Sequence, residues 1–285
     1  MRIAIASGKG GTGKTLISTC LTALWADEGH GVTYVDADAE EPNGHLFLKP
    51  GVTMQQRFSV RIPGVGSHPC LSHGKCQEIC AFNAILAKEG GALVFKSLCH
   101  SCGACILACP EDALREYDRE IGTIFVGKAG RASFLSGRLD VGEARVTPLI
   151  EELVSLVADS SELVVVDAPP GTSCSTIAAV RGADLLVLVT EPTPFGMHDL
   201  ELAVEMGKAL GMRIAAVVNR ADLGNDSVNR FLEEESIPIL AEIPFQRDVA
   251  ASYAQAQLPL YSCDLFGKKM SEMSQQLLTI IGDQS

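Results

Sequence analysis

Residues 8–15 of this 285-residue chain read Gly-Lys-Gly-Gly-Thr-Gly-Lys-Thr, a spacing that can bind phosphate. The segment fits G-x-x-x-x-G-K-[ST], in which backbone N–H groups close around the phosphate and a helix N-terminus adds its dipole. The Lys14 ammonium can reach the outer phosphates, and the Thr15 hydroxyl can bind Mg²⁺. The predicted nucleotide-binding residues are Gly8, Gly10, Gly11, Thr12, Gly13, Lys14 and Thr15.

Aspartates at the ends of two apolar segments suit the same site. Asp36 and Asp38 end one segment, and Asp167 ends another. In open α/β sheets, ligands bind outside the carboxyl ends of the strands, so these carboxylates are expected to face the phosphate loop. We predict Thr15 and Asp36 as ligands of Mg²⁺, which prefers oxygen ligands. A turn or helix cap is the alternative reading of each aspartate.

Seven of the ten cysteines crowd into residues 70–109. The run from Cys99 to Pro110 reads C-x2-C-x2-C-x3-C-P, the bacterial ferredoxin spacing, in which three thiolates hold one iron–sulfur cube and the fourth serves another. Zinc is the alternative, although its thiolate sites usually pair two C-x2-C knuckles. The spacing therefore predicts iron–sulfur ligation.

An incomplete second motif precedes this run, and full ferredoxin spacing would place its missing cysteine at His73. If ligands exchange as in two-cluster ferredoxins, one [4Fe–4S] site has four thiolates and the other has three. His73 either completes the second site or is a solvent-facing residue beside a [3Fe–4S] or labile cluster. The first set is Cys80, Cys99, Cys102 and Cys105, and the second is Cys70, Cys76 and Cys109 with His73.

The rest of the chain alternates β-branched runs with amphipathic stretches, which is typical of βαβ units. We predict strands at residues 2–7, 32–36, 163–167, 184–190 and 213–219, and helices at 13–28, 148–158, 198–210 and 227–235. The predicted fold class is α/β, with a doubly wound, mostly parallel sheet. A last helix near 265–281 carries an apolar stripe, Met270, Met273, Leu277, Leu278 and Ile281, which favours core packing.

The alternating pattern stops at about residue 64 and resumes after about residue 122. A hairpin is predicted from residues 84–86 and 92–95 across two glycines. We predict a small α+β ferredoxin-like domain over 64–123, inserted into a P-loop domain of residues 1–63 and 124–285. A connector punctuated by five glycines, over residues 122–142, is expected to return the chain to the α/β core. No internal repeat is apparent.

The composition disfavours several other functions. Thirty-five acidic and 23 basic residues give a net charge of -12, and aromatic residues make up 5%. A nucleic-acid binder needs clustered Lys and Arg or stacking aromatics, so we expect no nucleic-acid partner. We expect no signal peptide and no membrane span, because no apolar run is long enough. We also expect no basic membrane anchor, because the last helix offers only the basic residues Lys268 and Lys269, accompanied by the acidic residues Glu272 and Asp283. We expect a cytoplasmic protein.

Lys9 in G-K-G-G-T-G-K-T, with Asp38 and the D-A-P-P-G-T segment at Asp167, resembles the deviant Walker A ATPases of the MinD/ParA/Mrp and nitrogenase-iron-protein group. The resemblance implies an ATP/ADP- and Mg²⁺-dependent dimer, either a homodimer or a heterodimer with a related ATPase. It implies catalytic roles for Lys14, for Lys9 at the partner's ATP, and for Asp38 in orienting water, while Asp167 serves Mg²⁺. Asn219 and Pro244 resemble that group's adenine pocket.

The cysteine-rich insertion resembles MinD-superfamily ATPases that contain a ferredoxin domain, as do residues 137–143 and 190–196. The resemblance implies coupling of nucleotide state to cluster or electron transfer to a protein client. The alternative is a MinD/ParA-type positioning or scaffold ATPase whose clusters sense redox state. Cys174 matches a cluster-ligating cysteine of the nitrogenase iron protein, with a buried core thiol as the alternative, while Cys20 and Cys263 are expected to be structural.

Overall fold

The structure is a computed structural model that describes residues 1–157 and 162–282. The chain divides into two compact units. The first comprises Met1–Gln55, Ile124–Arg138 and Leu149–Ser285, and the second comprises Gln56–Thr123 and Leu139–Pro148. The domain predicted over residues 64–123 falls inside the second unit, and its identity and boundaries stay predictions.

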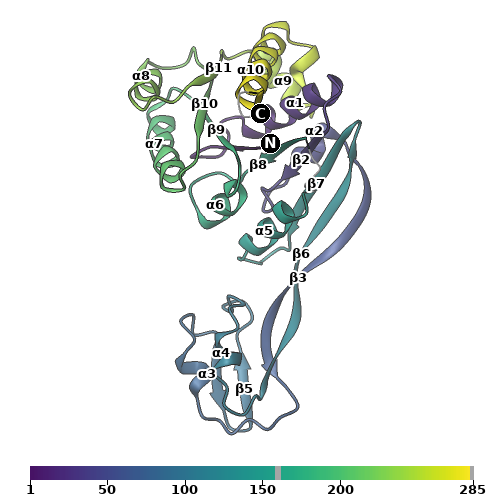
Figure 1. The fold of residues 1–285 in the computed structure, drawn as a ribbon, viewed down its shortest axis with the longest axis vertical. Coiled ribbons are helices and arrows are strands. Elements are labelled where there is room, and N and C mark those ends of the chain that lie inside the picture. Colours follow the sequence, from purple (N-terminus) through teal and green to yellow (C-terminus); the bar gives the residue numbers. More distant parts are fainter. Residues whose placement is uncertain (158–161, 283–285) are drawn as a thin grey trace. The chain divides into compact units, whose positions relative to one another are not determined.

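A large β-sheet forms the centre of the first unit (Figure 1). The strands of the chain are β1 (Arg2–Ala6), β2 (Val32–Asp36), β3 (Gly51–Val65), β4 (Ile85–Lys88), β5 (Gly91–Val94), β6 (Leu114–Ala129), β7 (Ala132–Leu139), β8 (Leu163–Asp167), β9 (Leu185–Thr190), β10 (Ile214–Asn219) and β11 (Ile239–Ile243). Within the described residues, nine strands pair in the order β11-β10-β9-β1-β8-β2-β7-β6-β3. The pairs from β11 to β7 are parallel, which confirms the predicted mostly parallel α/β class.

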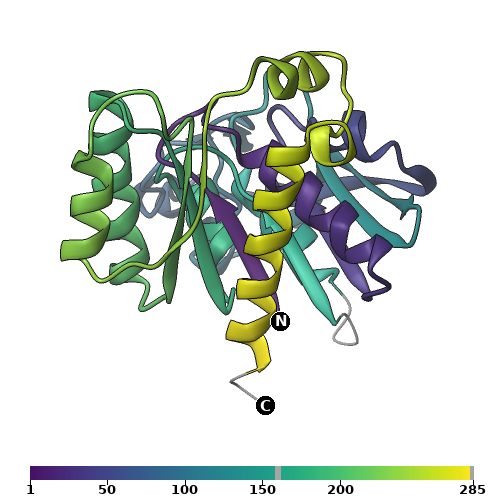
Figure 2. The same ribbon diagram turned by 90° about the horizontal axis from the view of Figure 1, so that it is seen from above.

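Helices cover both faces of this sheet (Figures 1 and 2). The helices of the chain are α1 (Lys14–Asp27), α2 (Gly44–Leu48), α3 (Lys75–Glu78), α4 (Ala104–Leu107), α5 (Thr147–Ser155), α6 (Cys174–Val180), α7 (Pro194–Ala209), α8 (Ser227–Glu234), α9 (Arg247–Ala254), the 3-10 helix η1 (Pro259–Tyr261) and α10 (Asp264–Gly282). Ile3 and Ile5 of β1 share a core with Ile17 of α1 and Met273 of α10. Alternate strand residues point to the opposite face, where α6 packs against β1 and α7 against β9.

The predicted strands and helices outside the insertion are present, with shifted ends. The largest shift is at α7, which begins at Pro194 instead of residue 198. Thr193 caps this helix, because its hydroxyl accepts a hydrogen bond from the Gly196 N–H at 3.0 Å. Proline at the first helical position has a backbone angle that suits a helix start. Residue 158, the predicted end of α5, lies outside the described residues.

The connector predicted over residues 122–142 has regular structure in spite of its five glycines. Strands β6 and β7 occupy most of this segment, and both lie in the main sheet. A Cβ at Gly127 would come within 2.5 Å of the Gly51 carbonyl oxygen. Glycine at this position therefore permits a close approach of backbones instead of breaking the strand.

The apolar stripe of α10 packs into the core of the first unit. Met270, Met273 and Leu277 are fully buried, and the Trp25 indole N–H donates to the Ser274 hydroxyl at 2.9 Å. This confirms core packing for the stripe. The Ile281 side chain and Asp283 lie outside the described residues. Within the described chain, none of the helices combines the length and apolar character needed to cross a membrane.

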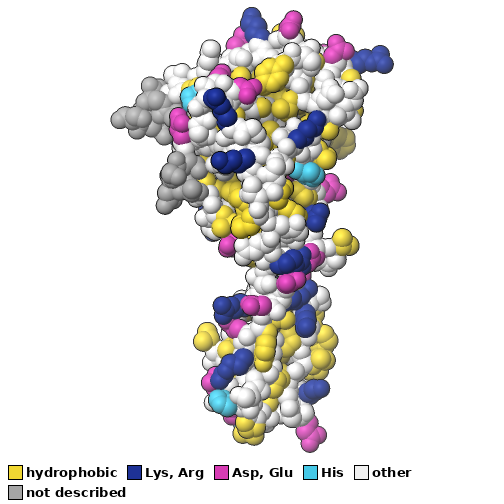
Figure 3. All heavy atoms as spheres, turned by 90° about the vertical axis from the view of Figure 1, so that its right-hand side faces the viewer, with side chains coloured by type: hydrophobic (Ala, Val, Ile, Leu, Met, Phe, Trp, Pro, Cys, Tyr) yellow, Lys and Arg dark blue, Asp and Glu magenta, His cyan; other side chains and the backbone are white. Residues whose placement is uncertain are grey.

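The surface carries mixed charges. Lys and Arg are interspersed with Asp and Glu on the face drawn in Figure 3. Some exposed charges are paired: Arg61 lies 3.0 Å from a carboxylate oxygen of Glu116. The expectation that nucleic acid is not a partner stays a prediction.

The second unit has a small core built around cysteines. β4 pairs antiparallel with β5, which confirms the predicted hairpin. Ile85, Leu114 and Cys105 form a buried cluster. Other cysteines packed against it are Cys76, Cys80 and Cys109. The packing therefore draws cysteines from distant parts of the sequence together.

Candidate functional site

A pocket of about 300 Å³ lies at the carboxyl ends of the parallel strands. It is lined by the phosphate loop, by residues that follow β2, β8 and β11, by the end of β10, and by α9. The predicted residues that line it are Gly10, Gly11, Gly13, Lys14, Thr15, Asp38, Asn219 and Pro244. Gly8 and Thr12 belong to the same loop between β1 and α1. The topology thus brings the predicted phosphate and adenine residues to one cavity.

The phosphate loop is fastened to the end of β10. Gly13 has a φ of 102°, a left-handed conformation that glycine adopts without a steric penalty. A Cβ at this position would lie 2.6 Å from the Asn219 side-chain nitrogen. That nitrogen donates to the Thr12 carbonyl at 2.8 Å. Asn219 therefore holds the loop in shape in addition to lining the pocket.

Two buried carboxylates lie side by side next to this loop. Asp36 and Asp167 are register partners on β2 and β8. One Asp36 oxygen accepts from the Gly44 N–H at 2.8 Å, and one Asp167 oxygen accepts from the Tyr34 hydroxyl at 3.0 Å. The other oxygen of each carboxylate is buried and has no hydrogen-bond partner among the described residues. Such oxygens fit a divalent cation. Thr15 lines the pocket, whereas Asp36 and Asp167 are buried behind its lining.

Burial controls the electrostatics of these acids. It raises the pKa of Asp36, with the neighbouring Asp167 adding to the rise. It also raises the pKa of Asp167, which the Lys14 ammonium opposes. The pKa of Asp38 rises to about 6 through burial, again against the opposing charge of Lys14. Asp38 and Asp167 thus lie near one buried ammonium, with Asp36 beside Asp167, and a further cation would stabilise this excess of carboxylates.

Lys9 is held by an acid that the sequence analysis did not identify as functional. Its ammonium lies 2.5 Å from one Glu191 oxygen, and the other oxygen accepts from Arg220 at 2.8 Å. Glu191 is buried, and Arg220 lines the pocket. Glu191 therefore links Lys9 to the pocket edge. Glu191 lies within residues 190–196, for which the sequence shows a resemblance, but the resemblance assigned this acid no role, since the role depends on contacts between distant loops.

The sequence analysis also missed one wall of the pocket. Phe245 and Gln246 follow β11, and Val249 and Tyr253 belong to α9. The Gln246 side-chain nitrogen is buried without a hydrogen-bond partner among the described residues, so it can donate to a ligand. The only sequence signal was the position of these residues directly after Pro244.

The second unit contains an internal repeat, contrary to the sequence analysis. Helices α3 and α4 begin 29 residues apart, each after a left-handed glycine. Ser72 and Ser101 have φ values of 58° and 57°. The thiol sulfurs of Cys80 and Cys109 each accept a backbone N–H at 3.3 Å. Conformation thus repeats at a spacing at which serine, glycine and cysteine also recur, and the repeat places His73 in the position of Cys102.

The first predicted ligand set lines a common pocket in the second unit. The four cysteines that line it are Cys80, Cys99, Cys102 and Cys105. Burial raises the pKa of Cys105 to about 11, and the other three thiols add to the rise because they are close. No three His, Cys, Asp or Glu side chains in residues 1–157 and 162–282 are grouped to hold a single metal ion. An iron–sulfur cube binds its thiolates through separate irons, so this set still fits one.

The second predicted set shares a neighbourhood as well. Burial raises the pKa of Cys76, and the nearby Cys70 and Cys109 add to the rise. His73 Nδ1 lies 2.8 Å from a Glu111 carboxylate oxygen. Metal-binding histidines usually pair their second ring nitrogen in this way, so the contact suits ligation through Nε2. The His73 side chain is also 42% exposed, and its ligand role stays a prediction.

The cysteines outside these two sets differ in exposure. Cys174, the first residue of α6, is exposed, so its reading as a buried core thiol is wrong. A role for Cys174 at a dimer axis stays a prediction. Cys20 and Cys263 are buried in the core of the first unit, as expected of structural thiols.

A glycine-rich loop between a strand and a helix, with a buried lysine and acids at parallel strand ends, defines a P-loop nucleotide-binding ATPase. Residues 3–260 match the CbiA family, described as the CobQ/CobB/MinD/ParA nucleotide binding domain. The chain belongs to this family and is an ATPase. The match runs through the cysteine-rich unit and does not identify a separate ferredoxin domain there.

Three proteins are similar to this chain over most of its length. An uncharacterized protein of Methanocaldococcus jannaschii is 30% identical, over 99% of this chain and 98% of its own length. An iron-sulfur cluster carrier protein of Pyrococcus abyssi is 24% identical, over 97% and 85%. The septum site-determining protein MinD of Pyrococcus horikoshii, solved with Mg-ADP, has a TM-score of 0.63 at 16% identity, with 100% of this chain and 98% of that chain covered. The last similarity shows the fold.

Proposed function

We propose that this ATPase couples its nucleotide state to the transfer of an iron–sulfur cluster, or of electrons, to a protein client. The observation that carries the proposal is the shared pocket of Cys80, Cys99, Cys102 and Cys105 in a chain that has a P-loop site. The distant similarity to an iron-sulfur cluster carrier supports it.

The nucleotide site has the groups that phosphoryl transfer needs. Lys14 neutralises charge on the outer phosphates, and Thr15, Asp36 and Asp167 would hold Mg²⁺ through their oxygens. Mg²⁺ would supply further charge neutralisation at the transferred phosphoryl group. Asp38 lines the pocket and orients the attacking water. Positioning and charge thus provide the rate enhancement in this proposal.

We expect Asp38→Asn to slow ATP hydrolysis roughly 100-fold and to change nucleotide affinity by less than about threefold. The reason is that an orienting carboxylate acts mainly in the transition state. Single-turnover hydrolysis and equilibrium binding measure the two effects separately. Glu40→Gln is the matched control, because Glu40 is exposed and lies two residues away. Equal losses of affinity and rate in Asp38→Asn would make Asp38 a structural residue.

Lys9 is proposed to act in a dimer, at the ATP that the partner chain binds. The ammonium must leave Glu191 to reach the partner's ATP, because one carboxylate oxygen holds it in the single chain. We expect Lys9→Ala to retain ATP binding and to lose roughly 1,000-fold in turnover, as for a cation supplied in trans. ATP turnover, and size measurements with a non-hydrolysable ATP analogue, test these two expectations. The control variant is Lys268→Ala, because Lys268 is exposed. Unimpaired turnover by Lys9→Ala contradicts the trans role.

The two cysteine sets would hold two clusters with unequal ligands. An iron–sulfur cluster supplies one-electron transfer, or serves as cargo when it is passed to the client. The first set would hold a [4Fe–4S] cluster through four thiolates. The second set would hold a [4Fe–4S] cluster with His73, or a [3Fe–4S] cluster without it. The unequal sets favour release from the second site.

A MinD/ParA-type scaffold ATPase, with the clusters as redox sensor, is the second candidate. The likeness to MinD over the whole chain favours it. Anaerobic purification, iron and sulfide analysis, and ATP turnover at defined redox states distinguish the candidates. Transfer of cluster or electrons that changes with nucleotide supports the first candidate. Turnover that responds to redox state without any transfer supports the second.

A further inference from the structure

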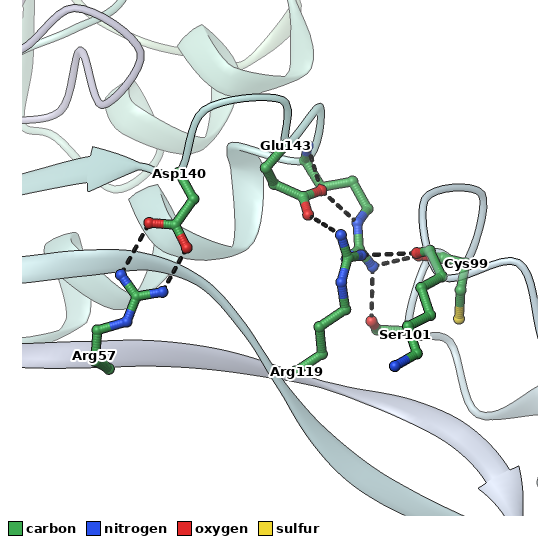
Figure 4. Close-up of polar contacts among 8 residues, drawn as sticks. Arg57, Cys99, Ser101, Arg119, Asp140 and Glu143 are labelled. Atoms are coloured by element: carbon green, nitrogen blue, oxygen red, sulfur yellow. Dashed lines mark hydrogen bonds and ion pairs between the residues drawn. The ribbon is translucent and has the colours of Figure 1, made fainter.

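A segment that follows β7 is anchored to the long strands of the second unit. We call residues 140–145 the strap. Arg57 of β3 pairs with Asp140 of the strap (Figure 4). Arg57 also lies 2.9 Å from a carboxylate oxygen of Glu120 in β6. Arg119 of β6 lies 2.6 Å from a Glu143 oxygen. Two arginines thus hold two acids of the strap.

The strap in turn holds the loop that carries Cys99 and Cys102. Arg145 donates to the backbone carbonyl of Cys99 and to the Ser101 hydroxyl, the latter at 3.1 Å (Figure 4). Its Nε lies 3.0 Å from the Glu143 oxygen that Arg119 does not contact. Arg119 also donates to the Lys96 carbonyl at 2.7 Å, just before the same loop. Glu143 therefore orients two guanidinium groups toward this loop.

The charged groups of Arg145 and Glu143 are removed from water. The side chains of Arg145 and Glu143 are 9% and 4% exposed. Although burial opposes it, hydrogen bonding to Arg145 lowers the pKa of Glu143. The group therefore combines two cations with one anion and has an excess positive charge. Burying an ion pair is costly, so the arrangement needs a reason beyond stability.

The strap contacts one half of the internal repeat. In the other half, Cys70 corresponds to Cys99 and Ser72 to Ser101. The Ser72 hydroxyl donates to the Lys88 carbonyl at 2.7 Å. No hydrogen bond to the Cys70 carbonyl is formed within the part of the chain that the structure describes. The strap thus makes the two cysteine loops unequal.

We propose that Arg145 is a positioning residue that fixes the loop of Cys99 and raises the reduction potential of the cluster held by Cys80, Cys99, Cys102 and Cys105. A positive charge near a cluster favours its more negative, reduced form. The redox half of this inference rests on the proposed function, whereas the positioning half is independent of it.

The positioning half is tested on the cluster-free full chain by thiol alkylation with peptide mass mapping. Cys99 is 7% exposed, and exposed Cys102 is the internal reference. A hydrogen bond to a charged group contributes about 1.5–3 kcal/mol, so Arg145→Ala should alkylate Cys99 roughly 10- to 100-fold faster. Cys99 should also be alkylated faster in Arg145→Lys, the milder variant, because lysine lacks the guanidinium fork. Exposed Arg61→Ala is the control. Unchanged Cys99 rates in both Arg145 variants overturn the inference.

The redox half is tested on anaerobically reconstituted protein by EPR-monitored titration. Arg145→Gln should lower the potential of the four-thiolate cluster, whereas Arg145→Lys and Arg61→Ala should leave it near the wild-type value. A potential that is unchanged in Arg145→Gln overturns the electrostatic role. If the wild-type chain binds no iron and sulfide, the proposed function fails, while the alkylation result still decides the positioning role.

Discussion

Lys14→Ala is expected to abolish ATP turnover and to weaken ATP binding roughly 100- to 1,000-fold, equivalent to about 3–4 kcal/mol. Lys14 is 7% exposed and lies among buried acids next to the phosphate loop. Its loss removes the cation that faces the outer phosphates, where burial strengthens electrostatic interactions. It also leaves the charges of Asp38 and Asp167 without their compensating ammonium. Calorimetric binding of ATP with Mg²⁺ measures the effect.

Exposed Lys268→Ala is the control for Lys14→Ala, since it changes the net charge equally. Thermal unfolding without nucleotide separates loss of fold from loss of binding. A Lys14→Ala protein that is folded and binds ATP with wild-type affinity would contradict the assignment of this pocket to the nucleotide.

Cys105→Ser is expected to remove about half of the iron and sulfide from anaerobically prepared protein, because one of two clusters loses a ligand. Cys105 is buried and lies in the pocket that Cys80, Cys99 and Cys102 also line. A serine hydroxyl is far less readily deprotonated than a thiol and is a poor substitute for a thiolate ligand. Iron, sulfide and EPR analysis give the loss directly.

Cys263→Ser is the matched control for Cys105→Ser. Cys263 and Cys105 are 7% and 8% exposed, so the two substitutions bury a hydroxyl in similar surroundings. The control should keep the wild-type iron content. Zinc in place of iron in the wild type, or equal iron in wild type and Cys105→Ser, would contradict the cluster assignment.

The sequence by itself determined the P-loop and most of the sheet, because both depend on local chemistry. The motif at Gly8 needs consecutive residues to shape one turn between a strand and a helix. Runs such as residues 163–166 and 185–189 are apolar throughout, since both faces of a parallel strand are buried. Cysteine spacing likewise predicted which thiols share a pocket, because the two-cluster ferredoxin pattern pairs Cys80 with the loop of Cys99, Cys102 and Cys105.

Only the tertiary structure showed how distant residues complete these sites. Glu191 holds Lys9, and the Asn219 amide holds the Thr12 carbonyl, across long separations in sequence. Arg145 reaches Cys99 because the strap returns to the second unit after β7. Local pattern carries no signal for such contacts, since they depend on where the chain returns.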